Sequence, residues 1–168
     1  MAASVRPEVP ADIDAIHRVN AAAFRTDGEA RLVDALRAAG KLTVSLVAES
    51  AGNIVGHVAL SPVALEGGMG GVGLGPVAVA PEFQRRGFGG QLIREGLVAC
   101  RQKGCRFVVV LGDPDYYGRF GFVAASRWRL RDEFGGGDAF MALELLPGRI
   151  PTGGGLVRYA PEFRLVTQ

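Results

Sequence analysis

One stretch of the chain limits the possible folds more than any other, because strand and helix patterns alternate in it around a glycine-rich turn. Val72–Val79 predicts a strand, and Gly87–Lys103 carries apolar residues at intervals of three and four, typical of a helix packed on a sheet. Gly104 ends that helix, and the continuously apolar Phe107–Leu111 predicts a strand buried on both faces. This order predicts a βαβ unit with two parallel strands.

The flanking segments predict that the βαβ unit belongs to a larger sheet. Asp12–Phe24 and Glu29–Ala39 have helical spacing, and Leu42–Glu49 with Ile54–Leu65 predicts an antiparallel hairpin around a tight turn. The remaining expected elements are a short helix at Asp115–Phe120 and strands near Ala139–Leu145 and Leu156–Tyr159. We therefore expect an α/β (mixed α+β) fold. Its central mixed sheet has about six to seven strands flanked by helices, antiparallel in the N-terminal part and parallel in the βαβ core.

Composition favours one globular domain over residues 1–168. Apolar residues make up 48% and charged residues 21%, which excludes a disordered chain. The longest aliphatic or aromatic run, Phe107–Leu111, is far shorter than the roughly 20 residues of a membrane helix. Met1–Asp14 lacks the features of a signal peptide. We expect a cytoplasmic protein that does not bind membranes.

The charges argue against a nucleic-acid partner, and the cysteines against a metal site. With 19 basic and 17 acidic residues the net charge is only +2. A nucleic-acid surface would have to use dispersed basic residues without interleaved aromatic rings, namely Arg101, Lys103, Arg106, Arg127, Arg129 and Arg131. Cys100 and Cys105, with His17 and His57, do not have zinc-ligand spacing, so we expect two buried or half-buried thiols and no metal.

The segment 84–90, Gln-Arg-Arg-Gly-Phe-Gly-Gly, has the properties of an anion site. It opens the long helix, where free N–H groups and the helix dipole favour negative charge. Its glycines let a polyphosphate approach the backbone, and Arg85 and Arg86 add positive charge. The alternative is that the glycines only allow close helix–sheet packing and that both arginines are solvated. The phosphate-binding loop of nucleotide hydrolases is absent.

These residues resemble the signature of the GCN5-related N-acetyltransferase (GNAT) superfamily. The strand Val77–Val79, a short loop and then 84–89 match the Gln/Arg-x-x-Gly-x-Gly/Ala motif, while Tyr117–Phe122 resembles the second motif, a tyrosine followed by Gly-Phe. The resemblance extends from Val5 to Tyr159. Within the superfamily, Ser45–Ala48, Gly56–Val58 and Gly112–Tyr117 resemble a bacterial YhbS-like branch of uncharacterised acetyltransferases.

The resemblance implies a GNAT-type fold and acetyl-CoA as the donor. A splay beside Pro76, which lacks a ladder donor, would leave a strand edge for the pantetheine arm. The Val77 amide would polarise the thioester carbonyl as charge develops on it, and Asp113 would contact pantetheine. The cofactor-binding residues implied are Val77, Ala78, Val79, Gln84, Arg85, Arg86, Gly87, Phe88, Gly89, Gly90 and Asp113.

Tyr117 takes the general-acid position of the family. The leaving thiol has a pKa of about 8.5 and tyrosine about 10, so the hydroxyl can donate to the sulfur. Tyr117 can instead be a core aromatic residue beside Phe120 and Phe122. Tyr116 is the rival if the helix is turned by one residue.

The general base and the acceptor are less constrained by the sequence. Candidates for the base are Glu29, Glu66, His57 and Asp113, each able to act through water, and we favour a pantetheine contact for Asp113. The acceptor walls predicted are Phe24, Asp27 and the loop 67–71.

The function implied is direct acetyl transfer to a primary amine in a ternary complex, since neither cysteine lies on the donor strand. The acceptor can be a small molecule or a protein amine, and a longer acyl-CoA is not distinguished from acetyl-CoA. The alternative function is an acyl-CoA-binding sensor with little turnover. A homodimer is expected if the late strand Leu156–Tyr159 is exposed and pairs across a twofold axis.

Overall fold

The computed structural model describes residues 3–66 and 70–166 and contains two sheets. The larger has seven strands in the order β1-β2-β3-β5-β6-β9-β7, which confirms the mixed sheet expected from the sequence. Its strands are β1 (Ser4–Pro7), β2 (Val44–Ser50), β3 (Asn53–Pro62), β5 (Val72–Val79), β6 (Phe107–Leu111), β9 (Phe140–Glu144) and β7 (Val123–Ala124). The helices are α1 (Ile13–Phe24), α2 (Gly28–Ala38), α3 (Phe88–Gln102) and α4 (Pro114–Tyr117).

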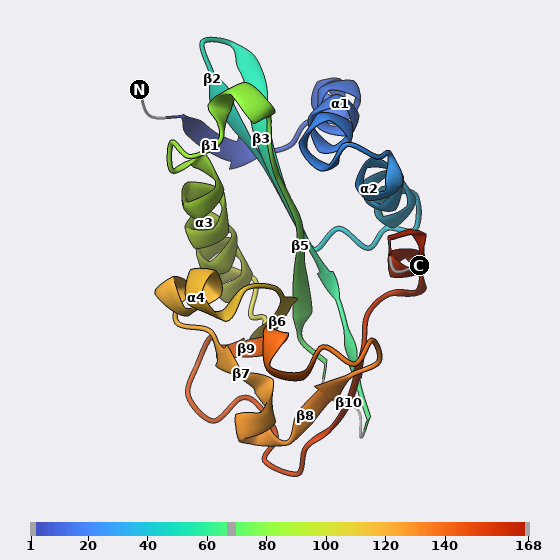
Figure 1. Ribbon diagram of the computed structural model, residues 1–168, viewed down its shortest axis with the longest axis vertical. Coiled ribbons are helices and arrows are strands. Elements are labelled where there is room, and N and C mark those ends of the chain that lie inside the picture. The colour runs from blue at the N-terminus through green and yellow to red at the C-terminus, as the bar shows by residue number, and fades with distance from the viewer. Residues whose placement is uncertain (1–2, 67–69, 167–168) are drawn as a thin grey trace.

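Helices cover both faces of the large sheet (Figure 1). The apolar stripe of α3, including Leu92 and Ile93, packs with Val58 and Leu60 in one core cluster. On the opposite face, α1 and α2 bury residues against β2 in a smaller cluster of Ile16, Val33 and Val47. The period-two alternation of the strands sends neighbouring residues to these two cores.

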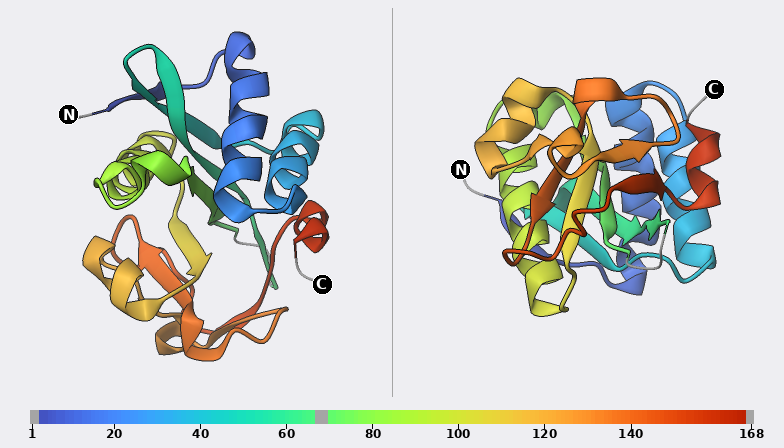
Figure 2. Two further views of the ribbon diagram at one scale, coloured as in Figure 1. Left: turned by 45° about the horizontal axis from the view of Figure 1, so that its top comes forward. Right: turned by 90° about the horizontal axis from the view of Figure 1, so that it is seen from below.

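Strands β5 and β6 are parallel, as expected, but they pair over only two positions, Val72 with Val108 and Gly73 with Val109. Beyond Gly73 they separate, and Figure 2 (left) shows β6 diverging from the neighbouring part of the sheet. On the other side, the register of β5 with β3 shifts around Pro76, where two residues of β5 lie opposite one of β3. The expected splay is present, and a bulge lies beside it.

The separation of β5 from β6 leaves one edge of β5 without a neighbouring strand beyond Gly73. Ala80 donates its N–H to Val55 of β3, so by the alternation of an antiparallel ladder Ala78 also faces β3. The N–H and C=O groups of Val77 and Val79 therefore point away from β3, into the gap towards β6. This is the edge that the sequence predicted at Pro76.

The late strand is present, as predicted, but the expectation that it has a free edge was wrong. β10 (Gly155–Arg158) is the central strand of a separate three-stranded sheet, between β4 (Ala64–Leu65) and β8 (Leu130–Asp132). With a partner on each side, β10 has no free edge to pair across a twofold axis. Its neighbours β4 and β8, of two and three residues, show too little alternation to be predicted from sequence as separate strands.

The sequence also led to expectations about the cysteines, a metal site and membrane-spanning helices. Cys100 is buried and Cys105 half-buried, both as free thiols, as expected. Within residues 3–66 and 70–166, no three His, Cys, Asp or Glu side chains gather closely enough to hold a metal ion. None of the helices described is long and apolar enough to cross a membrane.

Candidate active site

Three neighbouring cavities follow the gap between β5 and α4. The cradle, about 510 Å³, lies at the N-terminus of α3, and the inner pocket, about 310 Å³, lies between β5 and α2. A slot of about 240 Å³ shares lining residues with both. The slot shares Val79, Gln84, Gly89 and Tyr116 with the cradle, and Phe24, Val77 and Tyr117 with the inner pocket. The three cavities form one cleft.

The cradle has the geometry of an anion site. Gly87 precedes α3 with a φ of 87°, a left-handed conformation that favours glycine, and the first turn closes with Gln91 N–H donating to the Gly87 carbonyl at 3.0 Å. The N–H groups of residues 88–90 come before this first helical hydrogen bond. They have no partner within the helix and point out of its N-terminus, where the cradle lies. Arg85, Arg94 and Arg119 line the same cavity.

Two of these arginines were missed by the sequence analysis. Arg94 lies one turn after Gly90 on α3, and its guanidinium stacks over Phe120 at 5.1 Å. Arg119 follows α4 and stacks over Tyr116 at 5.4 Å. Helical spacing of four residues from Gly90 was the available signal for Arg94, whereas Arg119 is brought in only by the tertiary fold.

Several of the predicted cofactor-binding residues direct their side chains away from the cleft, so they could contact a cofactor only through the backbone. Phe88 buries its ring in the core at 4% exposure, and the side chain of Ala78 is fully buried, away from the slot. Arg86 does not line the cradle and instead stacks over Phe83 at 5.3 Å. Gln84 donates its side-chain amide to the Val79 carbonyl at 2.9 Å, which closes the loop onto the end of β5.

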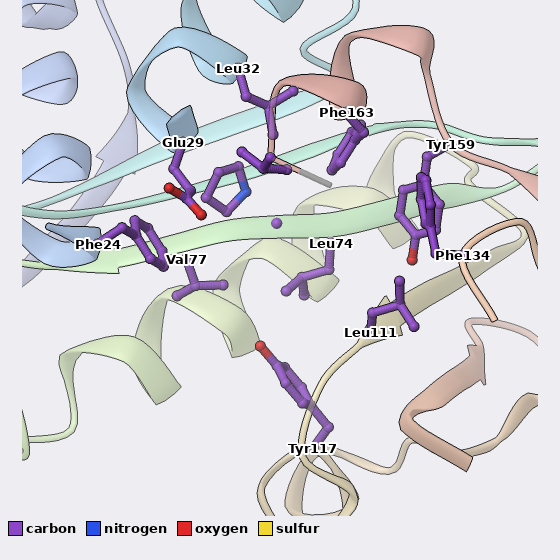
Figure 3. A pocket seen from close by; sticks show the side chains of 13 residues that line it. Phe24, Glu29, Leu32, Leu74, Val77, Leu111, Tyr117, Phe134, Tyr159 and Phe163 are labelled. Carbon is purple, nitrogen blue, oxygen red and sulfur yellow. The ribbon is translucent and has the colours of Figure 1, made fainter. Parts of the chain in front are cut away.

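Tyr117 stands where the slot meets the inner pocket, and its hydroxyl points towards β5 in Figure 3. The ring packs edge-on against Tyr116 at 5.0 Å and Phe122 at 5.9 Å. At Gly112 a Cβ would come within 2.3 Å of the Tyr117 ring, so the glycine allows the ring its position. Burial, with a smaller contribution from Tyr116, raises the pKa of Tyr117 to about 12. The hydroxyl is therefore protonated throughout the neutral range.

The two tyrosines differ in which cavities they reach. Tyr116 lines the cradle and the slot, whereas Tyr117 lines the slot and the inner pocket. Of the two, only Tyr117 lines both the slot and the inner pocket, which lies at the end of the cleft away from the cradle. Tyr117 is therefore the tyrosine that borders the inner pocket, and Tyr116 the one that borders the cradle.

Residues 4–125 match the family model described as "Acetyltransferase (GNAT) domain". The chain belongs to the GNAT family. It is 38% identical over 162 residues to the Escherichia coli (strain K12) "Uncharacterized N-acetyltransferase YhbS", covering 95% of this chain and 97% of that protein. The resemblance seen in the sequence motifs, including the YhbS-like branch, is confirmed.

Solved structures confirm the GNAT fold. The crystal structure of E. coli YhbS in complex with CoA matches with a TM-score of 0.92 at 38% identity, covering 98% of this chain and 93% of that one. A GNAT family acetyltransferase from Brucella melitensis, in complex with acetyl-CoA, matches with a TM-score of 0.82 at 43% identity. That match covers 96% of this chain and 97% of that one. The chain is thus an acetyltransferase of this family.

In this GNAT domain the four candidate bases lie in different places. Glu29, in the first turn of α2, lines the inner pocket with Val77 and Tyr117. Glu66 is an exposed residue beyond β4, outside the lining of the three cavities. Asp113 caps α4 by accepting from the Asp115 N–H at 3.0 Å, is exposed, and lines none of the three cavities.

The predicted acceptor walls also separate. Phe24 lines the inner pocket, whereas Asp27 precedes α2 and lines none of the three cavities. Residues 67–69 of the glycine-rich loop lie outside the described residues. The rings of Phe134, Tyr159 and Phe163 line the inner pocket and were not predicted. These residues come late in the chain, and no local sequence pattern predicts that they line a pocket.

His57 sits in a closed polar network away from the cleft. It is fully buried on β3, with Nε2 at 2.8 Å from the Ser45 hydroxyl and Nδ1 at 3.2 Å from the Asn20 amide. Ser45 in turn donates to Glu8, which pairs with Arg37 at 2.8 Å. These partners fit a neutral ring that donates from Nε2 and accepts at Nδ1. His57 lines none of the three cavities and both of its nitrogens are engaged, so the structure separates it from Glu29 and the cleft.

The buried His57 makes stability depend on pH. Desolvation, opposed by the charge of Glu8, lowers its pKa to about 4, against about 6.5 when unfolded. Between these values the unfolded chain binds the proton and the folded chain does not, so stability falls as the pH decreases. We expect the wild type to lose about 2 kcal/mol more unfolding free energy between pH 7 and pH 5 than His57→Gln does. Urea unfolding at both pH values measures this, and parallel losses would contradict it.

Proposed function

We propose that this GNAT domain transfers the acetyl group of acetyl-CoA to a primary amine that enters the inner pocket. One observation carries the proposal: the hydroxyl of Tyr117 lies where the slot opens into a pocket that contains the carboxylate of Glu29. The slot leads to the helix N-terminus and its three arginines, so the donor and the acceptor would enter from opposite ends.

The fit to acetyl-CoA is supported by this chain's own groups. The N–H groups at the start of α3, with Arg85, Arg94 and Arg119, suit a pyrophosphate. The edge of β5 at Val77 and Val79 has no neighbouring strand, although the Val79 carbonyl accepts from the Gln84 side chain, and it suits an extended arm bearing amides, bound as an added strand. Two relatives of similar fold were solved with CoA and with acetyl-CoA. Asp113 was expected to contact pantetheine through its side chain. We propose instead that its side chain serves as the cap of α4.

Each residue then has one task in the transfer. Glu29 attracts the ammonium of the acceptor and, directly or through water, takes the proton that must leave before the neutral amine can attack. The second proton, which the nitrogen loses as the amide forms, balances the charge of the departing CoA thiolate. The nitrogen forms a bond to the acetyl carbon while the carbon–sulfur bond breaks, and the Val77 N–H stabilises charge on the carbonyl oxygen. Tyr117 donates to the departing sulfur. With its pKa raised to about 12 it is a firmly protonated donor and a weak acid, so hydrogen bonding dominates over full proton transfer.

Release of free CoA thiol, followed by mass detection of the acetylated amine, tests the proposal. The purified chain is incubated with acetyl-CoA and a panel of primary amines, and acetyl-CoA alone measures background hydrolysis. We expect amine-dependent thiol release for at least one amine class. Tight acetyl-CoA binding without release for any amine would favour the alternative, a sensor domain with little turnover.

We further propose that residues 1–168 act as a single domain in the cytoplasm. A homodimer stays a prediction. It would have to use a surface other than the edge of β10, which is covered on both sides.

A further inference from the structure

The C-terminal end of α3 brings the two cysteines of the chain together. Cys100 lies in the last turn of the helix, and Cys105 lies two residues before the start of β6. Both side chains pack in one apolar cluster, Cys100 fully buried within it and Cys105 half-buried against it. Of the described residues that line the cradle, the slot and the inner pocket, none is a cysteine. The pair is therefore separate from the cleft.

The end of the helix has the geometry of a Schellman motif, which fixes the spacing of the two cysteines. Cys105 donates its N–H to the Cys100 carbonyl at 3.0 Å, and Gly104 donates its N–H to the Arg101 carbonyl at 3.1 Å. Gly104 has a φ of 81°, the left-handed conformation that the motif requires. In this motif the side chains of the first and sixth residues contact each other, and here both of these residues are cysteine.

The surroundings of the pair favour uncharged sulfur at the buried position. Burial, with a smaller contribution from the neighbouring Cys105 thiol, raises the pKa of Cys100 well above its ordinary value. A thiolate is therefore disfavoured at Cys100, whereas a disulfide carries no charge and suits the same apolar cluster. Cys105 is only half-buried, so an oxidant in solution reaches its sulfur first.

We propose that Cys100 and Cys105 form a reversible disulfide, which makes the end of α3 a modification site separate from acetyl transfer. The thiolate of Cys105 attacks a small disulfide oxidant such as oxidised glutathione, breaks its S–S bond and releases one glutathione thiolate. Cys100 then loses its proton and attacks the Cys105 sulfur, and the second glutathione thiolate leaves. The two released thiolates take up the two protons. Two protein thiols are oxidised and one glutathione disulfide is reduced, a transfer of two electrons.

The fold prepares the pair for this bond. In the unfolded chain the two thiols meet only when the segment between them closes by chance, whereas in the motif two backbone hydrogen bonds already hold its ends together. We therefore expect the equilibrium constant for disulfide formation to be higher in the folded chain. By reciprocity, the disulfide increases the equilibrium constant for folding by the same factor.

The disulfide lies far from the donor site. The cradle is at the N-terminus of α3 and the cysteines are at its C-terminus, so a helix of 15 residues separates them. At a rise of 1.5 Å per residue this is about 20 Å. We expect the oxidised and the reduced protein to bind acetyl-CoA with affinities within about twofold of each other.

The test equilibrates the full chain in mixtures of reduced and oxidised glutathione, once folded and once unfolded in urea. Samples are quenched in acid, free thiols are blocked and the mass is measured. We expect the folded chain to lose two hydrogens without a glutathione adduct, with an equilibrium constant at least about tenfold above that of the unfolded chain. Trypsin then gives peptides 95–101 and 104–106, which stay joined only if the disulfide links the two cysteines.

Two variants assign the steps to their sulfur atoms. Cys100→Ala keeps a small apolar side chain in the helix but lacks the sulfur that closes the bond, so we expect a stable glutathione adduct at Cys105. Cys105→Ser lacks the half-buried thiol, and Cys100 should then stay unmodified because it is fully buried. The wild-type peptide map decides the linkage even if a variant folds poorly.

Three results would each overturn the proposal: a glutathione adduct that persists in the wild type, a disulfide between two chains, or equal equilibrium constants for the folded and unfolded chain. A loss of acetyl-CoA affinity on oxidation would overturn the separation of this site from the donor site. The mass measurement requires no acetyl transfer, so this site and the proposed function can fail independently.

Discussion

Replacing Tyr117 by phenylalanine should lower kcat by about tenfold or more while the affinity for acetyl-CoA stays within about twofold. The substitution removes only the hydroxyl at the junction of slot and inner pocket. The ring, held by edge-on contacts with Tyr116 and Phe122, is retained, so the cleft keeps its shape. Initial rates of thiol release with the best amine of the panel measure kcat, and calorimetry measures binding.

Tyr116→Phe is the matched control. It deletes a hydroxyl from the neighbouring ring, which lines the cradle and the slot but not the inner pocket. We expect its kcat to remain within about threefold of the wild type, since it contributes no donor at the acceptor side. A Tyr117→Phe enzyme of unchanged rate, or a larger loss in Tyr116→Phe, would remove Tyr117 from the mechanism.

Gly89→Trp should abolish measurable acetyl-CoA binding, a loss of about a hundredfold or more in affinity. Gly89 lines both the cradle and the slot. A Cβ there stands 3.4 Å from the Tyr116 hydroxyl and 3.7 Å from Val79, which is ordinary contact, so the helix itself tolerates a side chain. The indole would then extend into the space assigned to the pyrophosphate and the pantetheine arm.

The control for Gly89→Trp places a tryptophan on the opposite side of α3. Val98 of α3 is 47% exposed, so Val98→Trp adds an indole to solvent without approaching the cleft. We expect Val98→Trp to bind acetyl-CoA as the wild type does. Equal losses of acetyl-CoA affinity in both variants would mean that a tryptophan disturbs the helix itself. Undiminished affinity in Gly89→Trp would mean that acetyl-CoA binds at another place.

Patterns within a single element predicted most of the fold. The three-and-four spacing of Gly87–Lys103 and the continuous apolar run Phe107–Leu111 each depend on local side chains, and both elements lie where expected. The splay beside Pro76 was also predictable, because a missing N–H removes a ladder bond wherever the residue lies. The anion site at the glycine-rich start of the helix was also predictable, since it depends on backbone N–H groups that any helix N-terminus offers.

The acceptor side was not predictable, since it is assembled from distant segments. Glu29 was one of four candidate bases, and only the position of α2 across the inner pocket from β5 separates it from Glu66 and Asp113. Tyr159 follows β10, whose place in a second sheet had no sequence signal. The buried position of His57 depends on Asn20 and Ser45, which approach it only in the fold.

The central claim is that acetyl-CoA binds along the open edge of β5, and amide hydrogen exchange of that strand followed by NMR tests it directly. Saturation with acetyl-CoA should slow exchange at the N–H groups of Val77 and Val79, which point into the gap. Exchange at Ala78, already bonded to β3, should change little in comparison. Unchanged exchange at Val77 and Val79 with acetyl-CoA bound would contradict the account of the donor site.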